Sequence, residues 1–194
     1  TAQLTTHTFA LHDALHAYDI ISGKNPESHL GIALLYSPDA IPQSTISLQP
    51  SGKELNNPGI GFIGAGSFAQ AQLLPPLRTL GIRMHAVTTS NPANALSVAK
   101  HFGFANAGTQ SEELIADPLT DIVFCASRHD THAQYVLSAV KKGKPIFVEK
   151  PLCVNRAELQ NIQSTVETHN GKVMVGFNRR FSKPFNWNVR NCAL

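Results

Sequence analysis

Ile60-Gly61-Phe62-Ile63-Gly64-Ala65-Gly66-Ser67-Phe68-Ala69 is a short apolar run that leads directly into the pattern G-x-G-x-x-A. The run predicts a buried strand, and the pattern predicts a tight turn into a helix. Gly64 permits the turn, Gly66 lacks the Cβ that would collide with a phosphate group, and Ala69 lets the helix pack close to the strand. We therefore expect a dinucleotide whose pyrophosphate lies over Gly66, Ser67 and Phe68, at the helix N-terminus.

A second apolar run, Phe147-Val148-Glu149-Lys150-Pro151, ends in a charged pair and a proline. Ligands of an open α/β sheet bind at the carboxyl ends of its strands, so this pair is a candidate site. A lysine ammonium beside a hydride acceptor can hold a substrate hydroxyl and take its proton as hydride leaves the carbon. We predict that Lys150 is catalytic and that Glu149 orients it; the alternative is a surface pair that begins a loop. The two runs together suggest a nicotinamide-dependent oxidoreductase.

The composition restricts the class of protein. The chain has 194 residues, 42% hydrophobic and 15% charged, which fits one globular domain with a small appendage. A net charge of +3 is too small to indicate nucleic-acid binding, and no apolar stretch approaches the roughly 20 residues of a membrane span. The cysteines are odd in number and show no C-x-x-C spacing, and the histidines form no metal-ligand pattern. We predict a cytoplasmic protein with no metal site, no nucleic-acid partner and no membrane partner.

The chain divides into parts of different character. Residues 1–36 predict a strand–helix–strand appendage with its helix at Leu11–Ser22, whose apolar face is Ala14, Leu15, Tyr18 and Ile21. Residues 37–58 are rich in Ser, Pro, Asn and Gly and predict a linker, with room for one strand at Thr45–Leu48. From Gly59 to about residue 185, strands alternate with helices, at 59–63, 83–88, 104–106, 121–126, 145–149 and 172–177. This alternation predicts an α/β fold, a doubly wound parallel sheet (Rossmann fold) in the order 3-2-1-4-5-6.

Helix boundaries are marked by capping residues. Asn91 or Ser90 precedes Pro92, Thr131 precedes the helix after the fourth strand, and Thr109 with Glu112 and Asn155 with Glu158 have capping-box spacing. Pro75-Pro76 falls inside the first expected helix of the Rossmann domain and should kink or interrupt it.

The end of the second strand bears on cofactor choice. An acid normally grips the ribose hydroxyls there, but Ala86-Val87-Thr88-Thr89-Ser90-Asn91 contains none. Thr89 and Ser90 can donate hydrogen bonds, which favours NADP over NAD, although no Arg follows to pair with the 2′-phosphate. The alternative is that Thr89 and Ser90 only cap the next helix.

The fourth strand ends in a polar cluster, Ala126-Ser127-Arg128-His129-Asp130-Thr131-His132. This segment should lie over the switch point of the sheet, near the nicotinamide half of the cofactor. Two histidines within it are candidates for ligand contact, with His132 as a catalytic candidate, and a structural role for them is equally compatible with the sequence.

From Gly59 to about Phe185 the chain closely resembles the dinucleotide-binding domain of the glucose–fructose oxidoreductase and inositol dehydrogenase family (Gfo/Idh/MocA). The matching segments are 61–69, 121–126, His132, 143–152 and Val175-Gly176-Phe177-Asn178-Arg179-Arg180-Phe181. The resemblance implies hydride transfer between NAD or NADP and a sugar- or polyol-like substrate, with cofactor contacts from Glu149, Lys150, Pro151 and Asn178. It also implies a cis Lys150–Pro151 bond and a second domain that supplies a catalytic histidine. This chain has Arg128-His129 where the family usually has Pro-Asn.

Residues 5–36 resemble the last strand–helix–strand of a medium-chain, zinc-type alcohol dehydrogenase, without its zinc ligands. With the non-Met start at Thr1 and a tail of only residues 186–194, this suggests an internal piece of a fused protein that lacks its substrate domain. We expect that such a piece does not catalyse hydride transfer by itself. Apolar surface at Phe177, Phe181, Phe185 and Trp187 favours either self-association into a homo-oligomer or disorder of the tail.

Two other functions share the same fold: a dinucleotide-sensing regulator without chemistry, and a scaffold domain with a vestigial pocket. The presence of Lys150 favours the enzyme.

Overall fold

The computed structural model describes residues 4–36, 44–49 and 57–181. The chain forms two compact units, Thr1–Gln43 and Ser44–Leu194. Across the described residues, no helix has the length and apolar character that a membrane span requires.

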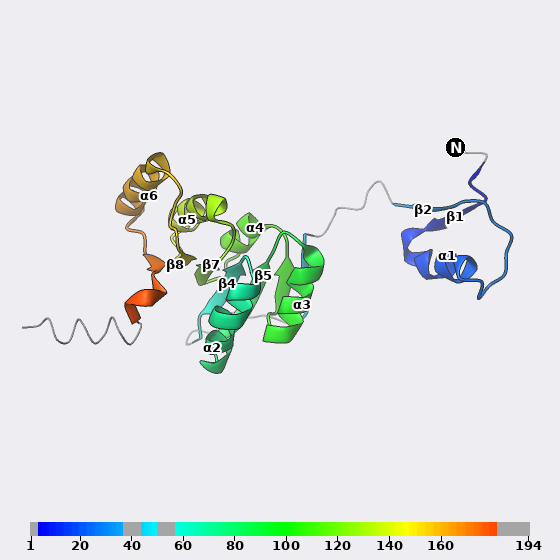
Figure 1. Cartoon of the computed structure of the whole chain (residues 1–194), viewed down its shortest axis with the longest axis horizontal. Helices are drawn as coiled ribbons and strands as arrows, with labels where there is room; N and C mark the ends of the chain where they lie inside the picture. Colours follow the sequence, from blue (N-terminus) through cyan, green and yellow to red (C-terminus); the bar gives the residue numbers. More distant parts are fainter. Residues whose placement is uncertain (1–3, 37–43, 50–56, 182–194) are drawn as a thin grey trace, which may run out of the picture. The chain divides into compact units, whose positions relative to one another are not determined.

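The first unit is a strand–helix–strand element (Figure 1). β1 (His7–Ala10) pairs in parallel with β2 (Ile32–Leu35), and a 3-10 turn and α1 (Ala14–Ile21) connect them. Ala17 and Ile20 are buried, whereas Leu15, Tyr18 and Ile21 are exposed. The predicted apolar face is therefore wrong apart from the partly buried Ala14, because the helix packs through the face that carries Ala17 and Ile20, three residues apart.

The second unit is built on a seven-stranded sheet in the order β3-β6-β5-β4-β7-β8-β9. From β4 onward all pairings are parallel. The strands from β4 to β9 keep the order 3-2-1-4-5-6, which confirms the doubly wound sheet. Their bounds are β4 Gly59–Ile63, β5 Arg83–Thr88, β6 Asn106–Gly108, β7 Ile122–Cys125, β8 Ile146–Glu149 and β9 Val173–Gly176.

The sheet also includes a strand from the predicted linker. β3 (Thr45–Ser47) pairs antiparallel with β6, and Ser44 Oγ donates a hydrogen bond to Glu113. The strand allowed at Thr45–Leu48 is therefore present, as an edge strand of the sheet, and the second unit begins at Ser44, before Gly59. The strand is short and polar, so its place depends on the partner strand and not on its own pattern.

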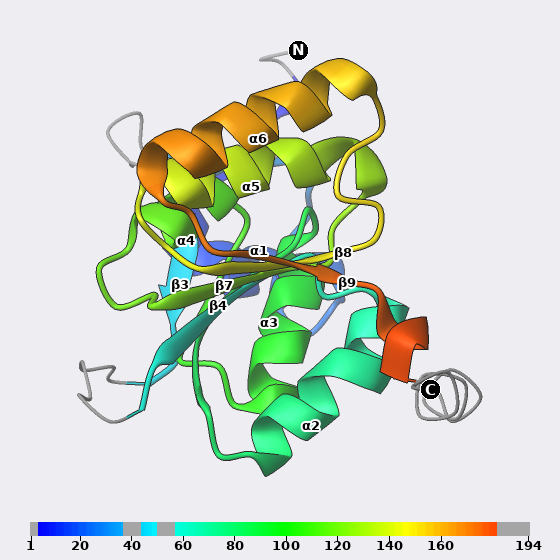
Figure 2. The same ribbon diagram turned by 90° about the vertical axis from the view of Figure 1, so that its left-hand side faces the viewer.

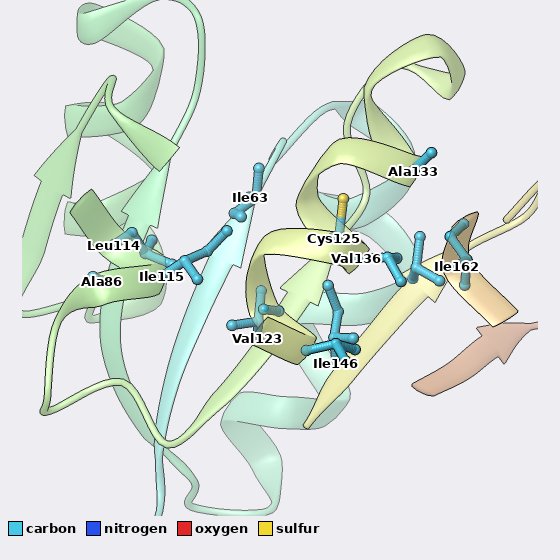
Figure 3. Packing of buried hydrophobic residues seen from close by; sticks show 13 residues of the cluster. Ile63, Ala86, Leu114, Ile115, Val123, Cys125, Ala133, Val136, Ile146 and Ile162 are labelled. Atoms are coloured by element: carbon cyan, nitrogen blue, oxygen red, sulfur yellow. The ribbon is translucent and has the colours of Figure 1, made fainter. Parts of the chain in front are cut away.

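Helices cover both faces of this sheet (Figure 2). α4 (Ser111–Ala116), α5 (His132–Lys141) and α6 (Arg156–His169) pack on one face, and α2 (Leu74–Thr79) and α3 (Pro92–Phe102) on the other. Figure 3 shows the core of the first face, where Ile63, Val123 and Cys125 from the strands meet Val136 of α5 and Ile162 of α6. Because β4 is buried along its whole length, the glycine turn at its end stands on a well-packed base.

Two of the predicted caps are present. Asn91 accepts hydrogen bonds from the N–H groups of Ala93 and Asn94, and Asn155 accepts one from Glu158 N at 2.9 Å. The Thr109 cap is wrong: α4 begins after Gln110, which makes no side-chain cap bond. Thr131 precedes α5, but its hydroxyl donates to Arg128 O and accepts no hydrogen bond from an N–H of the helix.

The proline pair interrupts the helix after β4, as predicted. A π-helical segment, Ala69–Leu73, precedes α2, and the prolines occupy the first turn of α2. Neither proline can donate the backbone hydrogen bond that a continuous α-helix requires, so the helix changes its winding at this point.

Candidate functional site

The turn after β4 requires glycine at position 64. Gly64 has a φ of +83°, and its N–H donates to Thr88 O at 2.9 Å. A Cβ at this position would lie 2.4 Å from Ser127 Cα. Only glycine therefore allows the ends of β4 and β7 to approach each other at this turn.

Gly66 is different, because packing does not explain it. A Cβ at this position would meet no protein atom within 4 Å. The space above the backbone is therefore open, and a side chain would fill it. This is the fit that a pyrophosphate needs: bare backbone at a helix N-terminus, whose first N–H groups have no partner inside the helix. Ser67 and Phe68 are exposed beside it, and the buried Ala69 lies beneath, where it contributes to packing.

A cavity of about 440 Å³, the glycine cavity, opens over the ends of β4, β5 and β7. Seven of the residues predicted to bind the cofactor line it: Gly64, Gly66, Thr89, Ser90, Ala126, Ser127 and Arg128. The polar residues that sequence reasoning missed are Thr88, Asn94, Thr109, Ser111, Thr131 and Tyr135. Thr109 directly follows β6. Its position at the carboxyl end of a parallel strand could have identified it as a residue of the binding site.

The walls of the glycine cavity are rich in hydroxyl groups. Thr88 Oγ1 and Ser111 Oγ are 2.9 Å apart, and Thr89 Oγ1 donates to Asn91 O at 2.6 Å. None of the described residues that line the cavity carries a carboxylate. Nothing in its lining would repel an additional phosphate on the ribose.

A second cavity of about 320 Å³, the lysine cavity, is lined by Phe68, Ala126, Ser127, His129, His132, Glu149, Lys150 and Asn178. Each of these residues was among the predicted site residues. Phe68 follows β4, Ala126 and Ser127 follow β7, and Glu149 ends β8, so the sheet topology brings them to one edge. Ala126 and Ser127 line both cavities, which therefore share a wall and suit two halves of one ligand.

The Glu149-Lys150-Pro151 turn presents its two charges differently. Lys150 is exposed, whereas Glu149 is only 7% exposed. Glu149 Oε2 accepts a hydrogen bond from the backbone N–H of Lys150 at 3.2 Å, and no ion pair joins the two side chains in the described structure. Glu149 thus fixes the main chain of Lys150 and leaves its ammonium free to meet a ligand. The Lys150–Pro151 bond is cis, as the resemblance implied.

His132 is held between two carbonyl groups. Its side chain is fully buried, with Nδ1 2.7 Å from Pro151 O and Nε2 3.1 Å from Ser127 O. The ring thereby ties the lysine turn to the loop after β7. This geometry favours a positioning role for His132 over direct proton transfer to a substrate. The exposed His129 has its ring centroid 5.7 Å from that of His132.

Cys125, the last residue of β7, is buried beneath these loops. Burial raises the pKa of its thiol, although hydrogen bonds with Ser127 act in the opposite direction. Cys125 is therefore a neutral core residue, which agrees with its place in an apolar run. The described residues hold no group of three or more His, Cys, Asp or Glu side chains that could bind a metal ion.

The comparisons with known proteins agree with this geometry. Inositol 2-dehydrogenase from Gluconacetobacter diazotrophicus is 37% identical over 131 residues, which cover 66% of this chain and 39% of that enzyme. A structure of scyllo-inositol dehydrogenase from Lactobacillus casei with bound NAD(H) and scyllo-inositol has a TM-score of 0.62 at 25% identity, and the match covers 69% of this chain and 40% of that one.

A 3-ketoreductase from Actinomadura kijaniata in complex with NADP has a TM-score of 0.63 at 21% identity, over 70% of this chain and 42% of that one, and shows the fold alone. The chain therefore spans about 40% of the length of such relatives. The oxidoreductase family with the NAD-binding Rossmann fold, Gfo/Idh/MocA, matches residues 59–177. This match covers more than half of the chain, and the chain belongs to the Gfo/Idh/MocA oxidoreductase family.

Proposed function

We propose that the second unit binds NAD or NADP across the two cavities and supports hydride transfer to or from a polyol- or sugar-like substrate. The observation that carries the proposal is the shared wall, Ala126-Ser127, between the cavity over Gly66 and the cavity that contains Lys150. Pyrophosphate and adenosine fit the glycine cavity, and the nicotinamide ring fits the lysine cavity. When bound, the cofactor supplies the hydride donor or acceptor.

The chain's own residues supply position and proton transfer. The exposed Lys150 ammonium would donate a hydrogen bond to the substrate oxygen, and its neutral amine would take the hydroxyl proton during oxidation. Glu149 holds the Lys150 backbone, and His132 holds the Pro151 carbonyl. The site therefore presents one proton acceptor on a turn that is fixed from both sides.

We propose that NADP binds at least as well as NAD. The support is the glycine cavity itself, whose described lining offers hydroxyls from Thr88, Thr89 and Ser90 and no carboxylate. Calorimetry with both cofactors tests this. A tenfold preference for NAD, about 1.4 kcal/mol, would contradict it.

The substrate class rests on the relatives, several of which are inositol 2-dehydrogenases. We propose a cyclic polyol or sugar derivative with neighbouring hydroxyl groups. Met174 and Phe177, which line a neighbouring cavity that shares Glu149 with the lysine cavity, expose 52% and 53% of their surface, so no described residue covers them on the substrate side. The isolated chain should therefore bind cofactor but turn over poorly, because hydride transfer requires a fixed substrate and excluded water.

The test compares Lys150→Met with Lys100→Met, a control at an exposed lysine of α3, in the natural full-length protein. Formation of reduced cofactor is followed with a panel of polyols and sugars that includes inositols. We expect Lys150→Met to reduce kcat by at least about 100-fold, with cofactor affinity changed little. Unchanged kcat in Lys150→Met would overturn the catalytic assignment. Cofactor binding without turnover of any polyol or sugar by the natural protein would favour a regulator.

Residues 5–36 remain the subject of a second proposal. We propose that they are the end of an alcohol-dehydrogenase-like module that precedes the Gfo/Idh/MocA domain; their parallel strand–helix–strand arrangement supports this. Cytoplasmic location and self-association stay predictions from the sequence. The predicted tail residues Phe185 and Trp187 and the side chain of Phe181 lie outside the described part of the structure.

A further inference from the structure

We propose that Arg128 is a movable cation of the glycine cavity, which exchanges Asp130 for a phosphate group of the bound dinucleotide. The inference rests on the proposed function, because it names a residue that determines cofactor affinity at that same site. It assigns a separate role to Asp130, which would compete with the cofactor for the guanidinium.

The charge of the cavity lining is the first observation. Arg128 is the one charged residue among the described residues that line the glycine cavity. The rest of the lining supplies backbone, hydroxyl, amide and apolar groups. A dinucleotide brings at least two negative charges on its pyrophosphate, and NADP adds a third phosphate. A planar guanidinium binds such groups through two parallel hydrogen bonds.

The present partner of Arg128 is easily displaced. Arg128 Nη2 lies 3.1 Å from Asp130 Oδ2, and the two side chains are 85% and 57% exposed. Ion pairs in water contribute little to stability, since solvent and salt screen them. A phosphate in the partly enclosed cavity is less screened, so exchange of partners is favourable.

The backbone below Arg128 is fixed, so that the exchange needs only side-chain motion. Arg128 O accepts hydrogen bonds from Thr131 N at 3.0 Å and Thr131 Oγ1 at 2.8 Å. Thr131 Oγ1 also lies 2.8 Å from Ser127 Oγ, at the shared wall of the two cavities. The loop therefore presents Arg128 at a constant place beside the cavity while its side chain remains free to turn.

The test measures binding of NADP, NAD and ADP-ribose by calorimetry at several salt concentrations. The variants are Arg128→Gln, Asp130→Asn and the double variant; Arg156→Gln, at an exposed arginine that begins α6, is the matched control for lost charge. We expect Arg128→Gln to weaken NADP binding about tenfold and to flatten its salt dependence. Asp130→Asn should tighten binding about twofold, because it frees Arg128, and should have no effect in the Arg128→Gln background.

The ligands show which phosphate is recognised. Equal losses for NADP, NAD and ADP-ribose in Arg128→Gln identify the pyrophosphate, and a loss confined to NADP identifies the 2′-phosphate. If the wild type binds the cofactors and Arg128→Gln behaves like Arg156→Gln, the inference is overturned while the proposed function stands. Tightening by Asp130→Asn that persists without Arg128 also overturns it, since Asp130 would then repel the ligand directly. If the wild type binds none of the ligands, both proposals fall.

Discussion

Gly176 lies directly opposite Glu149 in the β8–β9 pair, and a Cβ at position 176 would come within 2.7 Å of Glu149 Oε1. The carboxylate of Glu149 therefore occupies space that the missing side chain leaves. Because Glu149 is nearly buried and also holds the Lys150 backbone, Gly176 sets the position of the lysine turn from the neighbouring strand.

Gly176→Ala should consequently disturb the lysine cavity and leave the glycine cavity intact. The added methyl group displaces the Glu149 carboxylate, whose end can move, so we expect a stability loss of only about 1 kcal/mol. NADP binding should weaken about threefold to tenfold, whereas ADP-ribose binding should be unchanged because that ligand lacks the nicotinamide. Calorimetry with the two ligands measures the difference. Equal effects on both would show that Gly176 does not act through the lysine cavity.

Gly66→Val should abolish cofactor binding without a cost in stability. The added side chain enters open space, so the free energy of unfolding should stay within about 0.5 kcal/mol of the wild type. The same atoms occupy the volume assigned to the pyrophosphate. Unchanged affinity in Gly66→Val would place the cofactor elsewhere.

Gly64→Ala should behave in the opposite way. Its φ of +83° is costly for alanine, and the new Cβ would overlap the backbone of Ser127. We expect a loss of about 2–4 kcal/mol in the free energy of unfolding. Chemical denaturation measures it, with Gly66→Val as the matched control. A Gly64→Ala variant as stable as the wild type would contradict the close contact between the ends of β4 and β7.

His132→Phe distinguishes a positioning role from a catalytic one. Phenylalanine fills the buried volume but removes the ring N–H that donates to one of the two carbonyls, Pro151 O at 2.7 Å or Ser127 O at 3.1 Å. We expect about 1–3 kcal/mol of lost stability, measured by denaturation. Lost turnover in the natural protein with an unchanged free energy of unfolding would instead support His132 as a catalytic residue.

Most strand positions could be predicted because β4, β7 and β8 are largely buried and appear as apolar runs. The strand predicted at 104–106 is displaced, since β6 is Asn106–Gly108 and has no apolar run to mark it. The edge strand Thr45–Ser47 has only a weak sequence signal, because it is three residues long with one apolar side chain between two polar ones. It is a strand because it pairs with β6. The buried face of α1 was also predicted wrongly. Periodicity identifies an apolar face of a helix, but it does not show which face packs against the rest of the protein.

The same reasoning applies to the site. The lysine cavity could be predicted because its residues lie in four segments of the sequence, each at or just after the carboxyl end of one of the strands β4, β7, β8 and β9. Three other residues of the glycine cavity, Asn94, Ser111 and Tyr135, could not be predicted, because they come from three different helices. Their convergence depends on how the helices pack, which no local pattern encodes.

A separate pair, a buried histidine and a partly exposed aspartate, joins the sheet to α4 away from the site. His85, in β5, is 1% exposed, and its Nε2 lies 2.7 Å from Asp117 Oδ2 at the end of α4. Burial alone raises the pKa of Asp117, but hydrogen bonds from His85 and from Leu119 N–H, with the attraction of His85 and Lys144, outweigh it and hold the pKa below its usual value.

Asp117→Asn should therefore lower stability at neutral pH, by an amount that shrinks in acid. A carboxylate whose pKa is lower in the folded state stabilises the protein above its unfolded pKa of about 4, and this contribution is lost as the pH falls through the folded value. The difference in free energy of unfolding between wild type and Asp117→Asn should thus be largest above pH 4 and diminish below it. Urea denaturation from pH 7 to pH 3 measures the profile, with Glu167→Gln, an exposed position of α6, as the control for removal of a carboxylate. If the stability difference between wild type and Asp117→Asn does not diminish below pH 4, the ionised carboxylate is not what joins α4 to β5. The neutral acid would then hold His85 at least as well.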